Sequence, residues 1–159
     1  MSNFDRAFTI VASEEGGYVN DPNDPGGETK YGISKRQYPG EDIRGMTLDR
    51  AKELYKRDYW DIVKGDSLPW PLSALVFDAA VNQGAIPAVQ MMQRALDVTQ
   101  DGRIGPGTLN AAAKSGNYHY CRFMAFRTMR YQSSRNFDKY GEGWLNRCFN
   151  LMTEVSQKG

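Results

Sequence analysis

The segment that most constrains the fold is one in which an apolar helical stripe ends on a carboxylate. Phe4, Phe8 and Val11 recur at helical spacing, and Glu15 is the next member of the same stripe, whereas Glu14 is rotated away from it. A glutamate on the apolar face, at the C-terminal end of a helix where the macrodipole is negative, should be desolvated and discouraged from ionising. A carboxylic acid that keeps its proton near neutral pH is what general acid catalysis needs.

The segment after this helix is rich in turn-forming residues. Gly16 and Gly17 can end the helix and let a ligand approach the backbone, and residues 20–27 are a run of Pro, Gly, Asn and Asp. Such runs usually form surface turns, and the simplest interpretation is that the preceding glutamate only closes a helix. The alternative is that the turns fold back and bring Asp24 and Thr29 opposite it. A protonated acid facing a second carboxylate is the arrangement that glycosidases use.

Metal and nucleophile chemistry find little support in the sequence. A calcium-binding loop beginning at Asp21 would be interrupted by Pro22 and Pro25, and it would have Gly32 where the bidentate acid is needed. The one histidine, His119, and two distant cysteines make no zinc pattern, and no serine elbow accompanies the histidine. We therefore expect no metal and no cofactor.

The run from Glu15 to Ser34, EGGYVNDPNDPGGETKYGIS, resembles the signature of glycoside hydrolase family 108. Members of this family are N-acetylmuramidases found as phage and prophage endolysins, and some are labelled secretion activators. The resemblance implies cleavage of the β-1,4 bond between N-acetylmuramic acid and N-acetylglucosamine in peptidoglycan, with Glu15 as the catalytic acid. The spacing of Glu15, Asp24 and Thr29 is also similar to the Glu-Asp-Thr arrangement of phage-type lysozymes, although Thr29 lies one residue closer. We therefore assign catalytic roles to these three residues.

Further residues are expected to bind the substrate. A short β-hairpin is expected between residues 18 and 33, and four of its residues should line the cleft: Tyr18, Gly26, Gly27 and Tyr31. The segment FDAAVNQG, residues 77–84, resembles another block of the same family, so that Asn82 and Gln83 would offer amide groups to the sugar. An Asn-Gln-Gly sequence is also an ordinary helix stop, and both interpretations stay open. Asp78 is either a satisfied core carboxylate, which we favour, or part of the cleft.

The length of 159 residues suits one compact domain with a single core. Within it we distinguish a catalytic region, 1–88, from a helical region, 89–159, packed into the same domain. Residues 89–112 resemble a peptidoglycan-binding module, with a helix, a turn at residues 101–102 and a second helix entered through residues 105–106. The stretch is too short for an independent module. It either binds the wall or only completes the catalytic fold as a helical hairpin.

The remaining patterns are helical. Thr47 is a suitable N-cap for a helix over residues 48–60, and residues 72–81 are apolar nearly all round, as expected of a central buried helix. Two further helices are expected at about residues 118–137 and 143–155. The sequence therefore predicts a mainly α, lysozyme-like single domain with one short β-hairpin.

The net charge of +1 hides an asymmetry, because residues 114–159 hold 8 basic and 3 acidic residues. This basic end either settles on an anionic cell wall or forms ordinary solvated helix faces. Three aromatic residues in the same part of the chain either stack on sugar rings or belong to the core: Tyr131, Tyr140 and Trp144. We expect peptidoglycan as the partner and a monomeric protein. Nucleic acid is not expected, since no recognition motif accompanies the charge.

The N-terminal sequence MSNFDRAF lacks the features of a signal peptide, and no apolar run is long enough to span a bilayer. We therefore expect synthesis in the cytoplasm without membrane insertion, and access to the wall through holin-type release, as the resemblance suggests. Three rival functions stay open. They are a lytic transglycosylase, a chitinase-like enzyme acting on N-acetylglucosamine polymers, and a non-catalytic wall-binding or secretion-associated protein.

Overall fold

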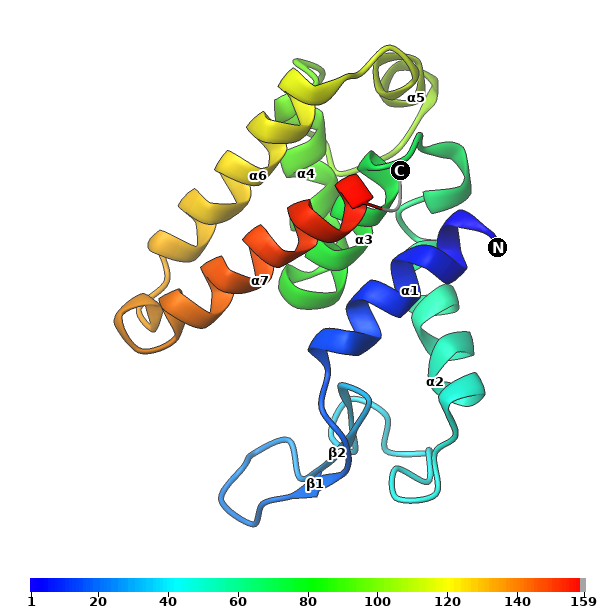
Figure 1. Ribbon diagram of the computed structural model, residues 1–159, viewed down its shortest axis with the longest axis vertical. Coiled ribbons are helices and arrows are strands. Elements are labelled where there is room, and N and C mark those ends of the chain that lie inside the picture. Colours follow the sequence, from blue (N-terminus) through cyan, green and yellow to red (C-terminus); the bar gives the residue numbers. More distant parts are fainter. Residues whose placement is uncertain (158–159) are drawn as a thin grey trace.

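The computed structural model describes residues 1–157, so the last two residues of the predicted 89–159 region lie outside the described part. It consists of a helical body with a small sheet at one end (Figure 1). The helices run as follows: α1 Asn3–Glu14, α2 Leu48–Tyr55, α3 Leu72–Gln83, α4 Ala85–Ala95, α5 Pro106–Ala113, α6 Asn117–Gln132 and α7 Phe137–Gln157. A π-helical turn, η1 Lys56–Trp60, continues α2, and a 3₁₀ turn, η2 Gly65–Ser67, precedes α3. The predicted mainly α, lysozyme-like fold is confirmed.

Helix α1 begins at a capping box and buries the apolar stripe seen in the sequence. The Ser2 hydroxyl accepts a hydrogen bond from the backbone N–H of Asp5, whose carboxylate accepts one from the backbone N–H of Ser2. Phe4 and Phe8 are buried against the core together with Val11. The helix packs on α3 and α7 and ends where the backbone turns extended at residue 15. The predicted helix and its buried apolar residues are confirmed, whereas Glu15, expected as the next member of the helical stripe, lies just beyond the helix in extended backbone.

Helix α3 is the centre of the body. Its residues from Leu72 to Ala80 are buried, and it packs against α1, α4, α6 and α7. Around Phe77 lie the rings of Phe4, Tyr55 and Trp60, all in edge-on contacts. The helix ends at Gly84, whose φ of 97° suits glycine. The predicted central helix and its stop at the Asn-Gln-Gly sequence are confirmed.

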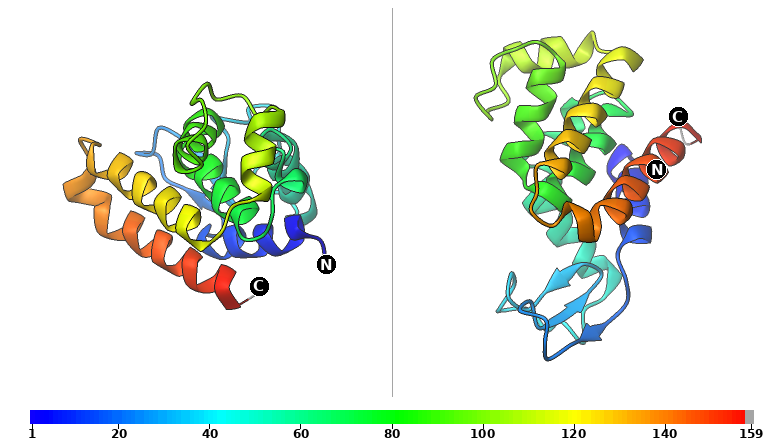
Figure 2. Two further views of the ribbon diagram at one scale, coloured as in Figure 1. Left: turned by 90° about the horizontal axis from the view of Figure 1, so that it is seen from above. Right: turned by 90° about the vertical axis from the view of Figure 1, so that its left-hand side faces the viewer.

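The sheet contains three short antiparallel strands: β1 Val19–Asn20, β2 Glu28–Lys30 and β3 Ile33–Ser34. It extends below the helical body (Figures 1 and 2). Lys30 pairs with Ile33, so the β2–β3 connection is a two-residue turn. Both turn residues, Tyr31 and Gly32, have positive φ (52° and 76°), as a type I′ hairpin turn requires. The predicted hairpin is present, and the third strand was not foreseen.

The helices after α3 form a layer in which α6 lies between α4 and α7 (Figure 2). The connection from α4 to α5 is organised by the buried Gln93. Its Nε2 donates to Asp101 Oδ1 (2.9 Å) and to the Arg103 carbonyl (2.8 Å), while its Oε1 accepts from the Gly102 N–H (2.9 Å). The turn at residues 101–102 and the helix start at Pro106 agree with the sequence analysis.

Some element boundaries differ from the predictions. The helix expected to reach residue 137 ends at Gln132, and the last helix begins at Phe137 rather than near residue 143. Thr47 does cap α2, since its side chain accepts a hydrogen bond from the Arg50 N–H. Leu48, although apolar, is exposed. Periodicity locates helices better than it locates their ends.

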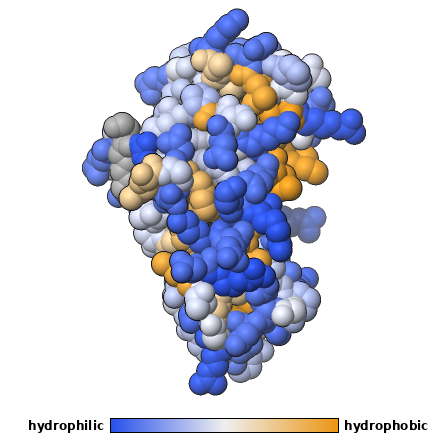
Figure 3. All heavy atoms as spheres, turned by 90° about the vertical axis from the view of Figure 1, so that its right-hand side faces the viewer, coloured by the Kyte–Doolittle hydropathy of each residue, from blue (hydrophilic) through white to orange (hydrophobic). Residues whose placement is uncertain are grey.

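The surface of the molecule is mainly hydrophilic on the face shown in Figure 3, where apolar atoms gather in patches in the upper half. Below this surface, one cluster of buried apolar side chains runs from Phe4 to Val155. Among residues 1–157, no helix has both the length and the apolar character to cross a membrane.

Candidate active site

Glu15 lies where α1 gives way to the sheet, and its side chain is 21% exposed. The carboxylate packs against the β2–β3 turn. A Cβ atom on Gly32 would lie 2.7 Å from Glu15 Oε2 and 2.5 Å from the Tyr55 hydroxyl. That hydroxyl donates to the Tyr31 carbonyl (2.7 Å) and so fixes the turn from the α2 side. Glycine at position 32 therefore allows both the left-handed backbone and the close approach of the carboxylate.

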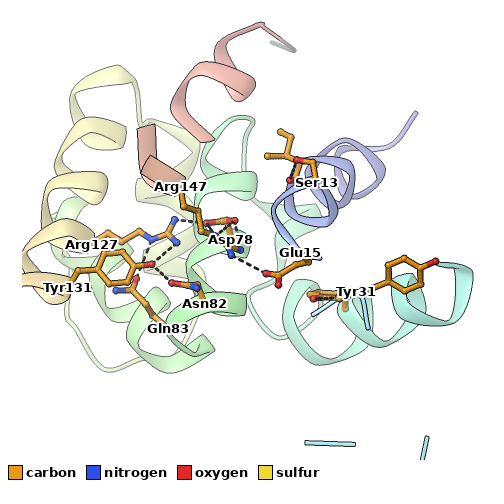
Figure 4. Close-up of polar contacts among 11 residues, drawn as sticks. Ser13, Glu15, Tyr31, Asp78, Asn82, Gln83, Arg127, Tyr131 and Arg147 are labelled. Carbon is orange, nitrogen blue, oxygen red and sulfur yellow. Dashed lines mark hydrogen bonds and ion pairs between the residues drawn. The ribbon is translucent and has the colours of Figure 1, made fainter. Parts of the chain in front are cut away.

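The Glu15 carboxylate is paired with an arginine from the far end of the chain. Arg147 Nη1 donates to Glu15 Oε1 (3.0 Å), while Nη2 and Nε of the same guanidinium donate to Asp78 Oδ1 at 2.9 and 3.2 Å. Arg127 Nη1 lies 2.7 Å from the other oxygen of Asp78 as an ion pair. Figure 4 shows the two arginines converging on Asp78, with Glu15 beyond Arg147. Two cations and two anions thus form one continuous cluster.

This cluster is largely shielded from water, which decides its ionisation. The side chains of Asp78 and Arg127 are 1% and 0% exposed, and that of Arg147 is 11% exposed. Burial alone would raise the pKa of the Asp78 carboxyl, but the charges of the two arginines hold it below its ordinary value. Burial would likewise lower the pKa of Arg147, but Asp78 and then Glu15 raise it overall. Asp78 is therefore the satisfied core carboxylate that the sequence favoured.

The ion pair between Arg147 and Glu15 was not foreseen. The sequence prediction for Glu15 rested on burial and on the helix dipole alone. The structure adds a guanidinium group whose Nη1 lies 3.0 Å from Glu15 Oε1. The candidate acid therefore lies in an ion pair with a residue of α7.

A hollow of about 230 Å³ opens beside Glu15 between the turn, α2 and the end of α3. Its walls include three tyrosines and two amides: Gln37, Tyr38, Tyr55, Tyr59 and Asn82. Burial raises the pKa of the Tyr55 hydroxyl, as does the nearby charge of Glu15, so this group stays a hydrogen-bond donor. The hollow therefore offers one carboxylate surrounded by neutral polar groups, a lining suited to a sugar.

A second hollow of about 370 Å³ lies next to the first, and Asn82 lines both. In its wall the Tyr131 ring stacks on Trp144 at a centroid distance of 4.9 Å, and the Tyr131 hydroxyl donates to Asn82 Oδ1. Arg127 Nη2 donates to that hydroxyl (3.2 Å), and Arg127 Nε donates to Gln83 Oε1 (3.2 Å). Asn82 and Gln83, which sequence analysis proposed as sugar ligands, are thus tied through Arg127 to the cluster around Asp78 (Figure 4).

Other residues expected at the site do not line the hollow beside Glu15. Asp24 lies in the exposed β1–β2 loop, where its Oδ1 accepts from the Gly26 N–H (2.9 Å). Thr29 is on β2, opposite Val19 of β1. The remaining expected residues, Tyr18, Gly27 and Tyr31, also belong to the sheet and its loops, and the Tyr18 hydroxyl donates to Glu28. Catalytic roles for Asp24 and Thr29 stay predictions.

Metal-ligating residues do not gather anywhere in the described chain. Within residues 1–157, no group of three or more His, Cys, Asp or Glu side chains could hold a metal ion. The buried carboxylate of Asp78 could ligate a metal ion, but it is bound by two guanidinium groups.

Comparison with known proteins gives a match to one family model and matches to solved structures. Residues 8–84 match the model of the family described as Glycosyl hydrolase 108. The structure of Brucella abortus SagA is similar over 97% of this chain and 94% of that chain, with 31% sequence identity and a TM-score of 0.85. No curated protein is similar enough to the chain to count as a relative. The family match includes Glu15 and Asp78 but neither of the two arginines that bind them.

Proposed function

The chain belongs to the glycosyl hydrolase 108 family, and from this we propose that it is an N-acetylmuramidase that cleaves the β-1,4 bond between N-acetylmuramic acid and N-acetylglucosamine of peptidoglycan. The observation that carries the proposal is the position of Glu15, whose carboxylate lies in the wall of a polar hollow. The neighbouring hollow with Trp144 and Tyr131 offers an aromatic surface beside it. Together they would hold adjacent sugars across the scissile bond.

Glu15 is the proposed general acid. As its proton moves to the glycosidic oxygen, Glu15 becomes a carboxylate, and its contact with Arg147 strengthens. An interaction that is stronger in the transition state than in the ground state accelerates the reaction. Arg147 is therefore proposed to position Glu15 and to stabilise the carboxylate that forms as the proton leaves.

The second group in a hydrolase activates water or stabilises the oxocarbenium-like sugar. We assign this role to Asp24, assisted by Thr29. Asp24 lies in the β1–β2 loop and Thr29 on β2, and this strand leads directly to the Tyr31–Gly32 turn against Glu15. A specific observation keeps a second function in view. Among the described residues, Glu15 is the one carboxylate that lines the hollow. A lytic transglycosylase needs a single acid, because a hydroxyl of the muramic acid replaces water.

Mass spectrometry of fragments released from purified peptidoglycan tests the proposal. Wild-type protein should release fragments with reducing muramic acid ends. Glu15→Gln should lower the rate on the order of 10²-fold or more while the fold is retained, since general acid catalysis contributes 10²–10⁴-fold. Glu14→Gln is the matched control, because Glu14 is the exposed neighbour at the end of α1, and it should behave as wild type.

Each other outcome has a defined meaning. Anhydromuramic ends in place of reducing ends would identify a transglycosylase that uses the same acid. Full activity of a correctly folded Glu15→Gln protein would contradict the assignment of the acid. Binding of the wall with no fragments from any of the three proteins would show a non-catalytic wall-binding protein.

A further inference from the structure

A third hollow continues the series along the groove between α4 and α6. It has a volume of about 370 Å³, and it shares Arg130 and Ser133 with the hollow beside Trp144. That second hollow shares Asn82 with the one beside Glu15. The three hollows therefore follow one another from the candidate acid to the groove between α4 and α6. A glycan bound in the first two would reach the edge of the third.

The third hollow is basic. Arg94 on α4 and Arg130 on α6 both line it, and both are exposed. Across residues 1–157, neither guanidinium forms an ion pair, in contrast to Arg127 and Arg147 in the cluster around Asp78. The guanidinium of Arg94 lies 4.0 Å from the ring centroid of Phe126, and this contact holds it over the groove. No acidic side chain lines either the second or the third hollow.

The rest of the lining is apolar and amide in character. Met91 and Phe126 supply apolar surface, and Gln90 and Gln100 supply amide groups that can pair with peptide bonds. A neutral polysaccharide has no use for two unpaired guanidinium groups. A phosphate-rich polymer would match the arginines but not the apolar surface. A short peptide with aliphatic side chains and free carboxylates matches all three features, because arginine pairs with carboxylates through charge-assisted hydrogen bonds.

We propose that this groove, formed by Arg94, Arg130 and the surface between them, binds the acidic stem peptide that the muramic acid of peptidoglycan carries. The proposal rests on the proposed function for its choice of substrate. It adds a recognition site outside the catalytic hollow, and it gives the enzyme a reason to prefer peptide-bearing glycan over chitin-like polymers.

Direct binding tests the groove without any need for turnover. The probe is a soluble stem tripeptide of alanine, glutamate and diaminopimelate with free carboxylates, titrated into the full chain by calorimetry or NMR. Arg94→Gln and Arg130→Gln should each weaken binding on the order of 10-fold, as expected for loss of one charge-assisted hydrogen bond. Arg135→Gln is the control, since Arg135 is an exposed arginine just beyond α6 that does not line the groove. It should bind as wild type does.

Two further probes separate the chemistry of the ligand. The same tripeptide with amidated carboxylates should bind much more weakly, and inorganic phosphate should not displace the free peptide at equal concentration. Equal binding of the amidated peptide, or displacement by phosphate, would overturn the proposal. Absence of peptide binding by wild-type protein would overturn it as well.

An activity comparison distinguishes failure of this inference from failure of the proposed function. Wild-type protein should have a higher kcat/KM on intact glycan strands than on strands stripped of peptide by an amidase. The preference should shrink in Arg94→Gln and Arg130→Gln, chiefly through KM. Equal cleavage of both substrates by wild type would contradict the stem-peptide site alone. Cleavage of neither, with tripeptide binding retained, would contradict the proposed function and leave the binding site in place.

Discussion

Nη1 of Arg147 lies 3.0 Å from Oε1 of Glu15, and Nη2 of the same guanidinium lies 2.9 Å from Oδ1 of the buried Asp78. One side chain of α7 therefore joins the candidate acid at the end of α1 to the central helix α3. Because Asp78 also binds Arg127, the position of Glu15 depends on charge balance inside the core. The first predictions test that dependence.

Replacing Arg147 should lower the catalytic rate. Arg147→Gln removes the guanidinium that contacts both Glu15 and Asp78, so kcat should fall because the Glu15 carboxylate loses its positioning contact. Arg147→Lys retains the positive charge and should keep more of the wild-type kcat than Arg147→Gln does. Steady-state kinetics on purified peptidoglycan measures both variants. Wild-type kcat in both variants would contradict the positioning role of Arg147.

Replacing Asp78 should destabilise the fold. Asp78→Asn leaves Arg127 and Arg147 as buried cations without their shared counter-ion, and breaking a buried pair in this way costs about 3–5 kcal/mol. Urea unfolding at pH 7 measures the loss. The control is Asp97→Asn, which breaks the ion pair to Arg122 at a position where the aspartate side chain is 73% exposed. That change should cost at most about 1 kcal/mol.

Wild-type protein and Asp78→Asn should differ in stability by an amount that depends on pH. The folded-state pKa of Asp78 lies below its ordinary value, so its ionisation stabilises the fold above the unfolded-state pKa of about 3.9. This stabilisation is lost as pH falls through the folded-state value. The difference in unfolding free energy between wild type and Asp78→Asn should therefore be constant from pH 7 to 5 and shrink below pH 4. A difference that stays constant in acid would mean that Asp78 is not ionised in the fold.

Replacing Gly32 should reduce activity by more than the accompanying loss of stability can explain. Gly32→Ala puts a Cβ atom against Glu15 and Tyr55 at a position with φ of 76°, and the left-handed backbone alone costs about 1–2 kcal/mol. Gly102→Ala is the matched control, since Gly102 has φ of 74° but lies on the loop after α4. Both variants should have a lower melting temperature. Only Gly32→Ala should have a lower kcat, by roughly 10-fold or more, because a displacement of Glu15 that costs the transition state about 1.4 kcal/mol lowers the rate tenfold. Equal kcat values for the two variants would contradict the positioning role of the turn.

The role of the second carboxylate can be tested with a closely matched control. Asp21 and Asp24 are both exposed in the β1–β2 loop, and each accepts a hydrogen bond of 2.9 Å from the backbone N–H two residues later. Asp24→Asn should reduce turnover on the order of 10²-fold if Asp24 activates water, whereas Asp21→Asn should not. If neither variant loses activity, a single-acid mechanism of the transglycosylase type is favoured.

Local patterns were the predictable part of this fold. The stripe of α1, the apolar helix α3 and the loop between β1 and β2 each depend on a few neighbouring residues, so periodicity and turn chemistry identified them. Glu15 was found in the same way, as the polar member of an apolar stripe. The type I′ turn at Tyr31–Gly32 was missed because tyrosine is an unusual residue for a positive φ.

The charged cluster was not predictable by these means. Glu15 and Arg147 are 132 residues apart, and no local pattern connects them. One signal was available, because Arg127 follows the apolar sequence FMAF on α6, where an arginine needs a buried partner. Together with Asp78, which also has apolar neighbours in the sequence, Arg127 would have indicated an ion pair in the core. The choice of Arg147 as the second partner depends on how α7 packs, which only the tertiary structure gives.

The order of these residues along the chain also bears on how the protein is made. During synthesis Glu15 and Asp78 leave the ribosome first, and both arginines that complete their cluster follow much later. A nascent chain that has not yet produced α7 carries an acid without its positioning contact and a core carboxylate without its full complement of charge. The charged cluster around Asp78 is therefore complete only after α7 has been synthesised.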